Sequence, residues 1–184
     1  MLVNTTDKPI LISYPLKGIT TKYKNVAKEK LMEFQTAVHD VMILEADYKN
    51  VDRSKMRAWL LKKGLPIEIV TRLDDLWDNT VAVSDKIIEI GKIIFCKILE
   101  FIKKYPHAAI GALLGAAVGA LINGVPFLGP LLAPLASSIG ALIGVVGGAQ
   151  LDTGKGDIQS LIIVAKDFFQ MIIDIFNAIF KKGN

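Results

Sequence analysis

The residues capable of covalent or metal chemistry are few and widely separated. The chain of 184 residues has two histidines, His39 and His107, and one cysteine, Cys96. Their positions match no spacing of zinc ligands, so the sequence predicts no metal site. A single cysteine also excludes an internal disulfide. Because Cys96 lies in an apolar helical pattern, we interpret it as a core residue.

The segment 152–157, Asp-Thr-Gly-Lys-Gly-Asp, is the closest approach to a phosphate-binding loop. A Walker A loop requires glycine where this chain has Ala149, and serine or threonine where it has Gly156. The segment also lacks the side-chain oxygens of an EF-hand loop. We therefore interpret it as a polar connection between helices.

The densest acidic group consists of Asp74, Asp75 and Asp78. Its pattern is that of a solvated helix face rather than of a paired general acid and base. No serine, histidine and aspartate are arranged for nucleophilic catalysis, and the sequence predicts no cofactor and no enzymatic activity. The net charge is +4. Basic residues are not interleaved with aromatic ones as in nucleic-acid-binding proteins, so no nucleic acid partner is expected.

Apolar residues recur every three or four positions along most of the chain, which predicts an all-α fold, a bundle of amphipathic helices. Ser54 is the expected N-cap of the second helix and Gly64 its stop. The expected helices cover residues 21–49, 54–63, 66–78, 80 or 84–105, and 157–182, after a short strand or extended arm at 9–14. We expect one domain, 1–184, made of an N-terminal arm (1–20), amphipathic helices (21–106), a hydrophobic hairpin (107–151) and a C-terminal amphipathic helix (152–184).

The expected hairpin is an apolar block without a charged residue. It extends from Ala108 to Leu151, which is far longer than the roughly 18 apolar residues that suggest a membrane-spanning helix. Proline and glycine interrupt its middle, so we predict two arms, 108–123 and 131–149, joined by a turn. The turn residues are Asn123, Gly124, Pro126, Gly129, Pro130 and Pro134. At about 24 Å the first arm is marginal for a bilayer core of about 30 Å.

Glycines recur every four residues in both arms, which places them on one face of each helix. The two rows are Gly111, Gly115 and Gly119, and Gly140, Gly144 and Gly148. Smooth faces of this kind let helix backbones approach closely, as they do within lipid. The rows therefore predict helix packing in a membrane.

Basic and aromatic residues precede the block. Lys103, Lys104 and Tyr105 are the expected interface anchors, because such residues hold the ends of a span at the membrane surface. Trp59 and Trp77 are interpreted as core residues or further anchors. The tip from Asn123 to Pro130 carries no charge, so insertion would move no charged side chain across the bilayer.

This architecture resembles that of the α-helical pore-forming domains of colicin-like toxins. It is also similar to small glycine-zipper effectors that bacteria inject into rivals. The resemblance covers most of the chain, with 108–151 as the hydrophobic hairpin and the remaining helices as its shell. It implies a bacteriocin-like antibacterial toxin that inserts its hairpin into a target membrane, expected to be a bacterial inner membrane, and permeabilises or depolarises it by ion transport.

The implied partners are a lipid bilayer, further copies of the chain in a membrane homo-oligomer, and an immunity protein or secretion chaperone. No signal peptide is evident, so synthesis in the cytoplasm and export by a non-Sec route are expected. Two alternatives stay open. One is a resident integral membrane protein with a structural or assembly role, such as a holin-like or scaffold subunit. The other is a soluble helical binding module whose hairpin is simply core.

Overall fold

The computed structural model describes residues 17–150 and 158–180, with side chains for 24–141 and 160–180. The expected arm at 9–14 and the polar segment 152–157 lie outside the described residues. By internal packing the chain divides into two compact units, Met1–Glu33 and Phe34–Asn184. The first contributes the start of helix α1, and the features below belong to the second.

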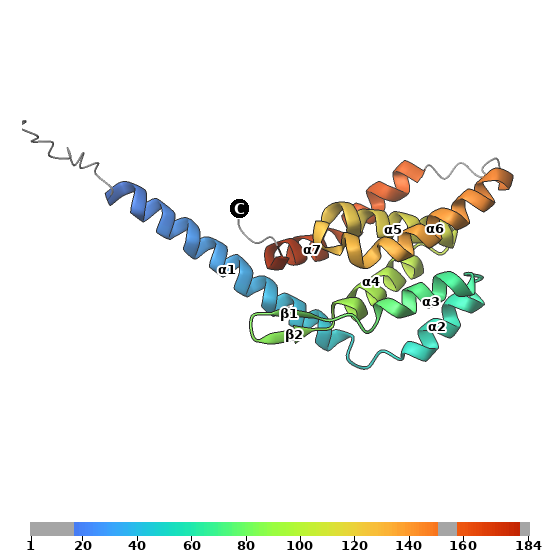
Figure 1. Cartoon of the computed structure of the whole chain (residues 1–184), viewed down its shortest axis with the longest axis horizontal. Coiled ribbons are helices and arrows are strands. Elements are labelled where there is room, and N and C mark those ends of the chain that lie inside the picture. Colours follow the sequence, from blue (N-terminus) through green and yellow to red (C-terminus); the bar gives the residue numbers. More distant parts are fainter. Residues whose placement is uncertain (1–16, 151–157, 181–184) are drawn as a thin grey trace, which may run out of the picture. The chain divides into compact units, whose positions relative to one another are not determined.

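The described chain is almost entirely helical, which confirms the all-α prediction. Figure 1 shows the helices together with one small hairpin of strands. The elements are α1 (Lys17–Asp47), α2 (Arg53–Lys62), α3 (Ile67–Leu76), β1 (Val81–Val83), β2 (Lys86–Ile88), α4 (Ile90–Lys104), α5 (Ile110–Gly124), the 3₁₀ turn η1 (Pro126–Leu128), α6 (Gly129–Gln150) and α7 (Ile158–Phe180).

The ends of α2 are set by capping. The predicted N-cap, Ser54, is instead a residue of the helix, and Asp52 caps it by accepting a hydrogen bond from the Lys55 backbone N–H at 3.0 Å. A carboxylate two residues earlier is an equally good cap, which the sequence alone does not distinguish. Gly64 stops the helix as predicted, with a φ of 89° that favours glycine.

A two-stranded hairpin replaces the beginning of the helix expected over 80–105. β1 and β2 pair antiparallel, with Val83 opposite Lys86. Ser84, a predicted helix start, lies in the turn between the strands with a φ of 57°. The helical pattern placed Ile87 inward, yet it is 73% exposed, whereas Ile88 is buried. β-Branched residues at this density favour a strand as readily as a helix, and the periodicity over so short a stretch does not decide between them.

The apolar hairpin is the centre of the second unit. α5 contacts α7, α6 and α4, while α6 also packs on α3 (Figure 1). From α5 and α6 the core takes Leu113, Leu114, Ala116, Ala117, Val118, Ala120, Leu121, Leu132, Leu135 and Ile139. Among the described residues the core contains no buried polar or charged side chain. Hydrophobic burial therefore holds the hairpin in place.

Polar interactions are concentrated elsewhere, between the elements that precede α5. Arg53 on α2 pairs with Asp74 on α3 at 2.7 Å and with Asp78 at 2.9 Å. The Tyr48 hydroxyl donates to Glu100 on α4 at 2.7 Å, and the Glu89 backbone N–H donates to the Glu45 carboxylate at 2.8 Å. These links join α2 to α3 and the C-terminal part of α1, from Phe34, to α4. The two pairs are connected by the Gly91 N–H on α4, which donates to the Asn79 carbonyl after α3 at 2.9 Å. We call these elements the polar-linked shell.

Candidate functional site

The candidate site is the helical hairpin α5–α6. Its tip, from Asn123 to Pro130, contains the end of α5, the turn η1 and the start of α6. The predicted arms correspond to α5 and α6, but the turn between them is shorter than expected. Asn123 and Gly124 end α5, Pro126 begins η1, and Gly129 and Pro130 begin α6. Proline is tolerated in the first turn of a helix, because its missing N–H would have no partner there. The break that these residues predicted is therefore only a few residues long.

Pro134, which was expected in the turn, lies inside α6. Its ring removes the hydrogen bond that its own N–H would otherwise have donated to the carbonyl of Pro130. Because Pro134 is close to the start of α6, few preceding turns are disturbed. Ser138, one turn later, donates through its hydroxyl to the Pro134 carbonyl at 3.0 Å.

One side chain outside the hairpin forms a hydrogen bond to its tip. The Asn177 amide on α7 donates to the Gly124 carbonyl at 2.8 Å. The same end of α5 approaches α7 closely, since a Cβ added at Gly124 would lie 2.6 Å from Cδ1 of Ile173. Gly124 therefore permits close packing as well as ending α5, and its place in the predicted turn gave no sign of this.

Two members of the predicted glycine rows leave open space in the second unit. A Cβ added at Gly119, which is half-buried, or at Gly140, which is exposed, would meet nothing within 4 Å. Gly111 and Gly115 are also half-buried. Gly144 and Gly148 belong to the helical part of α6, but their surroundings lie outside the described residues.

Gly91, which sequence reasoning missed, lies at a very close approach of two helices. A Cβ added at Gly91, in the first turn of α4, would lie far inside contact distance of the Leu76 carbonyl oxygen. The Gly91 N–H donates to the Asn79 carbonyl at 2.9 Å. The Asn79 side chain in turn donates to the last carbonyls of α3, those of Asp75 and Leu76. A lone glycine in an apolar stretch carried no signal of this helix junction.

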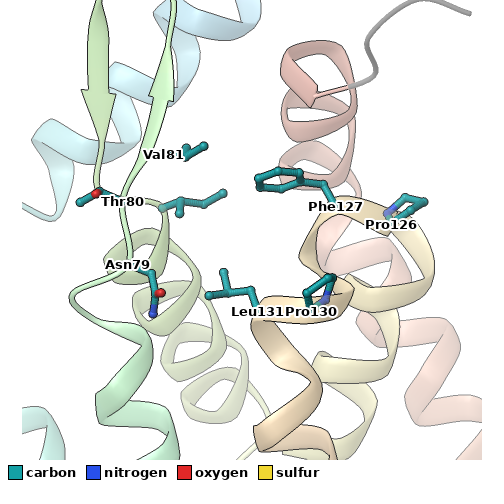
Figure 2. A pocket seen from close by; sticks show the side chains of 8 residues that line it. Asn79, Thr80, Val81, Pro126, Phe127, Pro130 and Leu131 are labelled. Atoms are coloured by element: carbon teal, nitrogen blue, oxygen red, sulfur yellow. The ribbon is translucent and has the colours of Figure 1, made fainter.

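An apolar pocket separates the tip of the hairpin from the polar-linked shell. Its volume is about 520 Å³. Figure 2 shows Asn79, Thr80 and Val81 on one wall and Phe127, Pro130 and Leu131 on the other. Ile90 and Pro126 complete the lining, which contains no charged residue. The tip is thus incompletely packed on the shell, and no ion pair crosses this boundary because the hairpin has no charged residue.

The predicted anchors lie at the other end of α5. Lys103 and Lys104 are exposed and end α4, and Tyr105 follows as its C-cap. Nearby side chains from α2 and α7 join them. The Lys103 and Lys63 ammonium groups lie 5.3 and 5.6 Å from the ring centroid of Trp59. Trp59 was predicted as a core residue or a further anchor. No pattern in the sequence indicated that Phe168 is close to Lys104, whose ammonium group lies 5.3 Å from the ring centroid.

Burial raises the pKa of two side chains, Tyr48, which contacts α4, and Cys96, which belongs to α4. Burial, together with the hydrogen bond to Glu100, raises the pKa of the Tyr48 phenol. Burial also raises the pKa of the Cys96 thiol to about 11. The thiol is therefore protonated near neutral pH and poorly nucleophilic, in agreement with its interpretation as a core residue. No group of three or more His, Cys, Asp or Glu side chains in the described parts could hold a metal ion.

Comparison with protein-family models, curated protein sequences and solved structures gives no match to this chain. Of the prediction of membrane-spanning arms, the part that is confirmed is a helical bundle that contains both arms as helices. Within 17–150 and 158–180, no helix is both long enough and apolar enough to cross a bilayer.

Proposed function

We propose that this chain is a pore-forming protein that permeabilises a target membrane by moving the hairpin α5–α6 from the helical bundle into lipid. One observation carries the proposal. The hairpin has no charged residue and is held in the bundle by apolar packing, with Asn177 as its described side-chain hydrogen bond to a neighbouring helix. Lipid can replace apolar packing at little cost, whereas breaking buried ion pairs would be expensive.

The distribution of polar links supports a defined mode of opening. The shell before α5 is joined by ion pairs and hydrogen bonds within the pairs α2–α3 and α1–α4, and by the hydrogen bond from Gly91 to Asn79 between these pairs, so it would separate as one body. The pocket between the tip and the shell offers a boundary at which separation begins with little loss of packing. Tyr105 to Ala109, which connects α4 to α5, would then be the hinge.

The length of α5 limits how the hairpin can act. Its 15 residues measure about 22 Å, against about 30 Å for a bilayer core. A mismatch of this size is accommodated by local thinning of the bilayer or by oligomerisation. The open faces at Gly119 and Gly140 would be available for helix association between copies.

Burial of the hairpin also favours a second candidate function. α5 and α6 contribute much of the core, and no described helix meets the requirements for spanning. A helical binding module whose hairpin never leaves the core has these same properties. Both candidates predict the same folded chain. Only the pore-forming candidate predicts that the chain binds lipid vesicles and permeabilises them.

Dye release from liposomes tests the proposal. Detergent-free protein is added to vesicles loaded with a self-quenched dye, at neutral and at acidic pH. We expect release that increases with protein concentration. Tight vesicle binding without release would favour a resident scaffold-like membrane protein, and no binding at all would favour the helical binding module. Either result contradicts the pore-forming proposal.

A further inference from the structure

Three helices bring basic and aromatic side chains together at the base of the hairpin. We propose that this basal patch is the surface that first docks on a membrane, by binding anionic phospholipid headgroups. The basal patch consists of Trp59 from α2, Lys63 at the C-cap of α2, Lys103 and Lys104 from α4, Tyr105, and Phe168 from α7. The inference extends the proposed function by naming its lipid class and docking surface.

The basal patch consists of two groups of contacts that are linked through consecutive residues of α4, Lys103 and Lys104. Lys63 and Lys103 lie over the same ring, that of Trp59. Lys104, next in the chain, lies 5.9 Å from the Tyr105 ring and 5.3 Å from the Phe168 ring. Residues far apart in the sequence therefore form two adjacent groups of lysine and aromatic side chains, which is why only part of the surface was evident from the sequence.

The aromatic rings are fixed from below. Phe101 is fully buried, and its ring centroid lies 5.1 Å from that of Tyr105 and 5.2 Å from that of Phe168. Phe168 also contacts Phe169, which is buried. The half-buried rings at the surface thus rest on a rigid aromatic core. Tryptophan and tyrosine rings, like those of Trp59 and Tyr105, are enriched at the headgroup level of membranes.

The charge of the basal patch is not neutralised by the described protein. Lys63, Lys103 and Lys104 are exposed, and none forms an ion pair with another residue that the structure describes. Glu100, the nearest acidic residue along α4, is instead paired with Lys97 at 2.8 Å. Three unpaired lysines around aromatic rings complement an anionic headgroup layer, where each basic residue strengthens binding about fivefold.

The location of the basal patch fits the proposed insertion. Tyr105 precedes Ile110, the first residue of α5, by only a few residues. A hairpin that inserts tip first keeps its base at the surface from which it entered. The same side chains can therefore contact headgroups before and after insertion. The basal patch can stay bound to the membrane surface while the tip enters the bilayer.

The test uses the full chain and two charge-matched triple variants. One carries Lys63→Gln, Lys103→Gln and Lys104→Gln, and the control carries Lys49→Gln, Lys55→Gln and Lys86→Gln. Cosedimentation measures binding to phosphatidylglycerol–phosphatidylcholine vesicles and to vesicles of phosphatidylcholine alone. We expect the first variant to bind the anionic vesicles about a hundredfold more weakly than the unmodified chain. The control should lose far less, and neutral vesicles should show no such difference.

A second readout does not depend on the lysine substitutions. The chain has two tryptophans, Trp59 and Trp77, so Trp77→Phe leaves Trp59 as the only indole emitter. On anionic vesicles its emission should shift to the blue and be quenched by lipids brominated near the headgroup. Unchanged Trp59 emission on bound vesicles would overturn the inference.

Other outcomes separate this inference from the proposed function. If both triple variants bind equally while dye release persists, the basal patch is not the docking surface but pore formation stands. If the first variant loses binding while the unmodified chain never releases dye, docking stands and pore formation fails. Binding to duplex DNA, with the same lysine dependence and without vesicle binding, would contradict both.

Discussion

Gly91 and Gly119 are both helical glycines, but the spaces around them are opposite. At Gly91 a Cβ would collide with the Leu76 carbonyl, whereas at Gly119 it would meet nothing within 4 Å. The first glycine is required by the approach of α3 to α4. The second costs helix stability without serving the packing of the folded chain, which suggests that its role lies in another state of the protein.

We expect Gly91→Ala to destabilise the chain by about 3 kcal/mol or more, because the collision is with backbone that cannot move aside. Gly119→Ala should instead stabilise it by about 0.5–1 kcal/mol, because alanine is the better helix former. Urea unfolding followed by circular dichroism measures both. Similar stabilities for the two variants would show that the α3–α4 junction is not as close as described.

Cys96 offers a pH-dependent check on the packing of α4. Burial raises its pKa to about 11, and only the thiolate reacts with iodoacetamide. The alkylation rate of the folded chain should therefore keep rising with pH up to about 11. An exposed cysteine would level off near pH 8.5. Mass spectrometry measures the rate, and a plateau near pH 8.5 would show that α4 is not packed as described.

At the scale of elements, polar and apolar interactions divide the second unit into two groups. Ion pairs and hydrogen bonds join α2 to α3 and the end of α1 to α4, while α5 and α6 are held by apolar side chains. Asn177 is the described polar side chain of α7 that contacts the tip. Its hydrogen bond to Gly124 should therefore slow the release of the hairpin.

Asn177→Ala should destabilise the folded chain by about 1 kcal/mol and accelerate dye release from anionic vesicles. Asn123→Ala is the matched control, because Asn123 is exposed and donates only within α5, to the Gly119 carbonyl. Stopped-flow release compares the two. Equal rates for both variants would mean that separation of α5 from α7 does not limit insertion.

Close helix packing in lipid is tested by a pair of bulky substitutions. Gly119→Leu with Gly140→Leu fills two positions that are open in the folded chain, so folding should be retained. If helices associate through these faces, dye release should fall at least tenfold while vesicle binding survives. Ala141→Leu, at an exposed neighbour of Gly140, is the control. Undiminished release by the double variant would exclude this packing.

For the molecule as a whole, the long helices and the break at Gly64 were predictable, whereas the short strands were not. The ranges of α1 and α7 agree with the sequence pattern within a few residues because their apolar stripes extend over many turns. Those of α2 and α3, ten residues each, agree because Gly64 marks the break between them. The strands β1 and β2 escaped prediction because Val83 and Ile87 fit a helical stripe as well as a strand. Pro134 was predicted in the turn but lies inside α6. Whether a proline breaks a helix depends on how many turns precede it, and the start of α6 was not known from the sequence.

The candidate site was predictable as far as it depends on composition. Absence of charge and a central break identified the hairpin, but spacing along the chain cannot show which helices surround it. Tertiary packing alone brings Trp59 and Phe168 to the end of α4 that precedes the hairpin, and Asn177 to the end of α5. The same limit applies to Gly119 and Gly140, because the period of the glycine rows was evident but the open space at these two positions was not.

The depth that the hairpin tip reaches in a membrane decides whether the hairpin inserts into lipid. Asn123, exposed at the end of α5, is replaced by cysteine in a Cys96→Ala background and labelled with an environment-sensitive nitrobenzoxadiazole dye. On anionic vesicles, insertion of the hairpin predicts a rise in fluorescence and stronger quenching by spin labels deep in the acyl chains than by labels at the headgroup. Unchanged fluorescence on fully bound vesicles would contradict it.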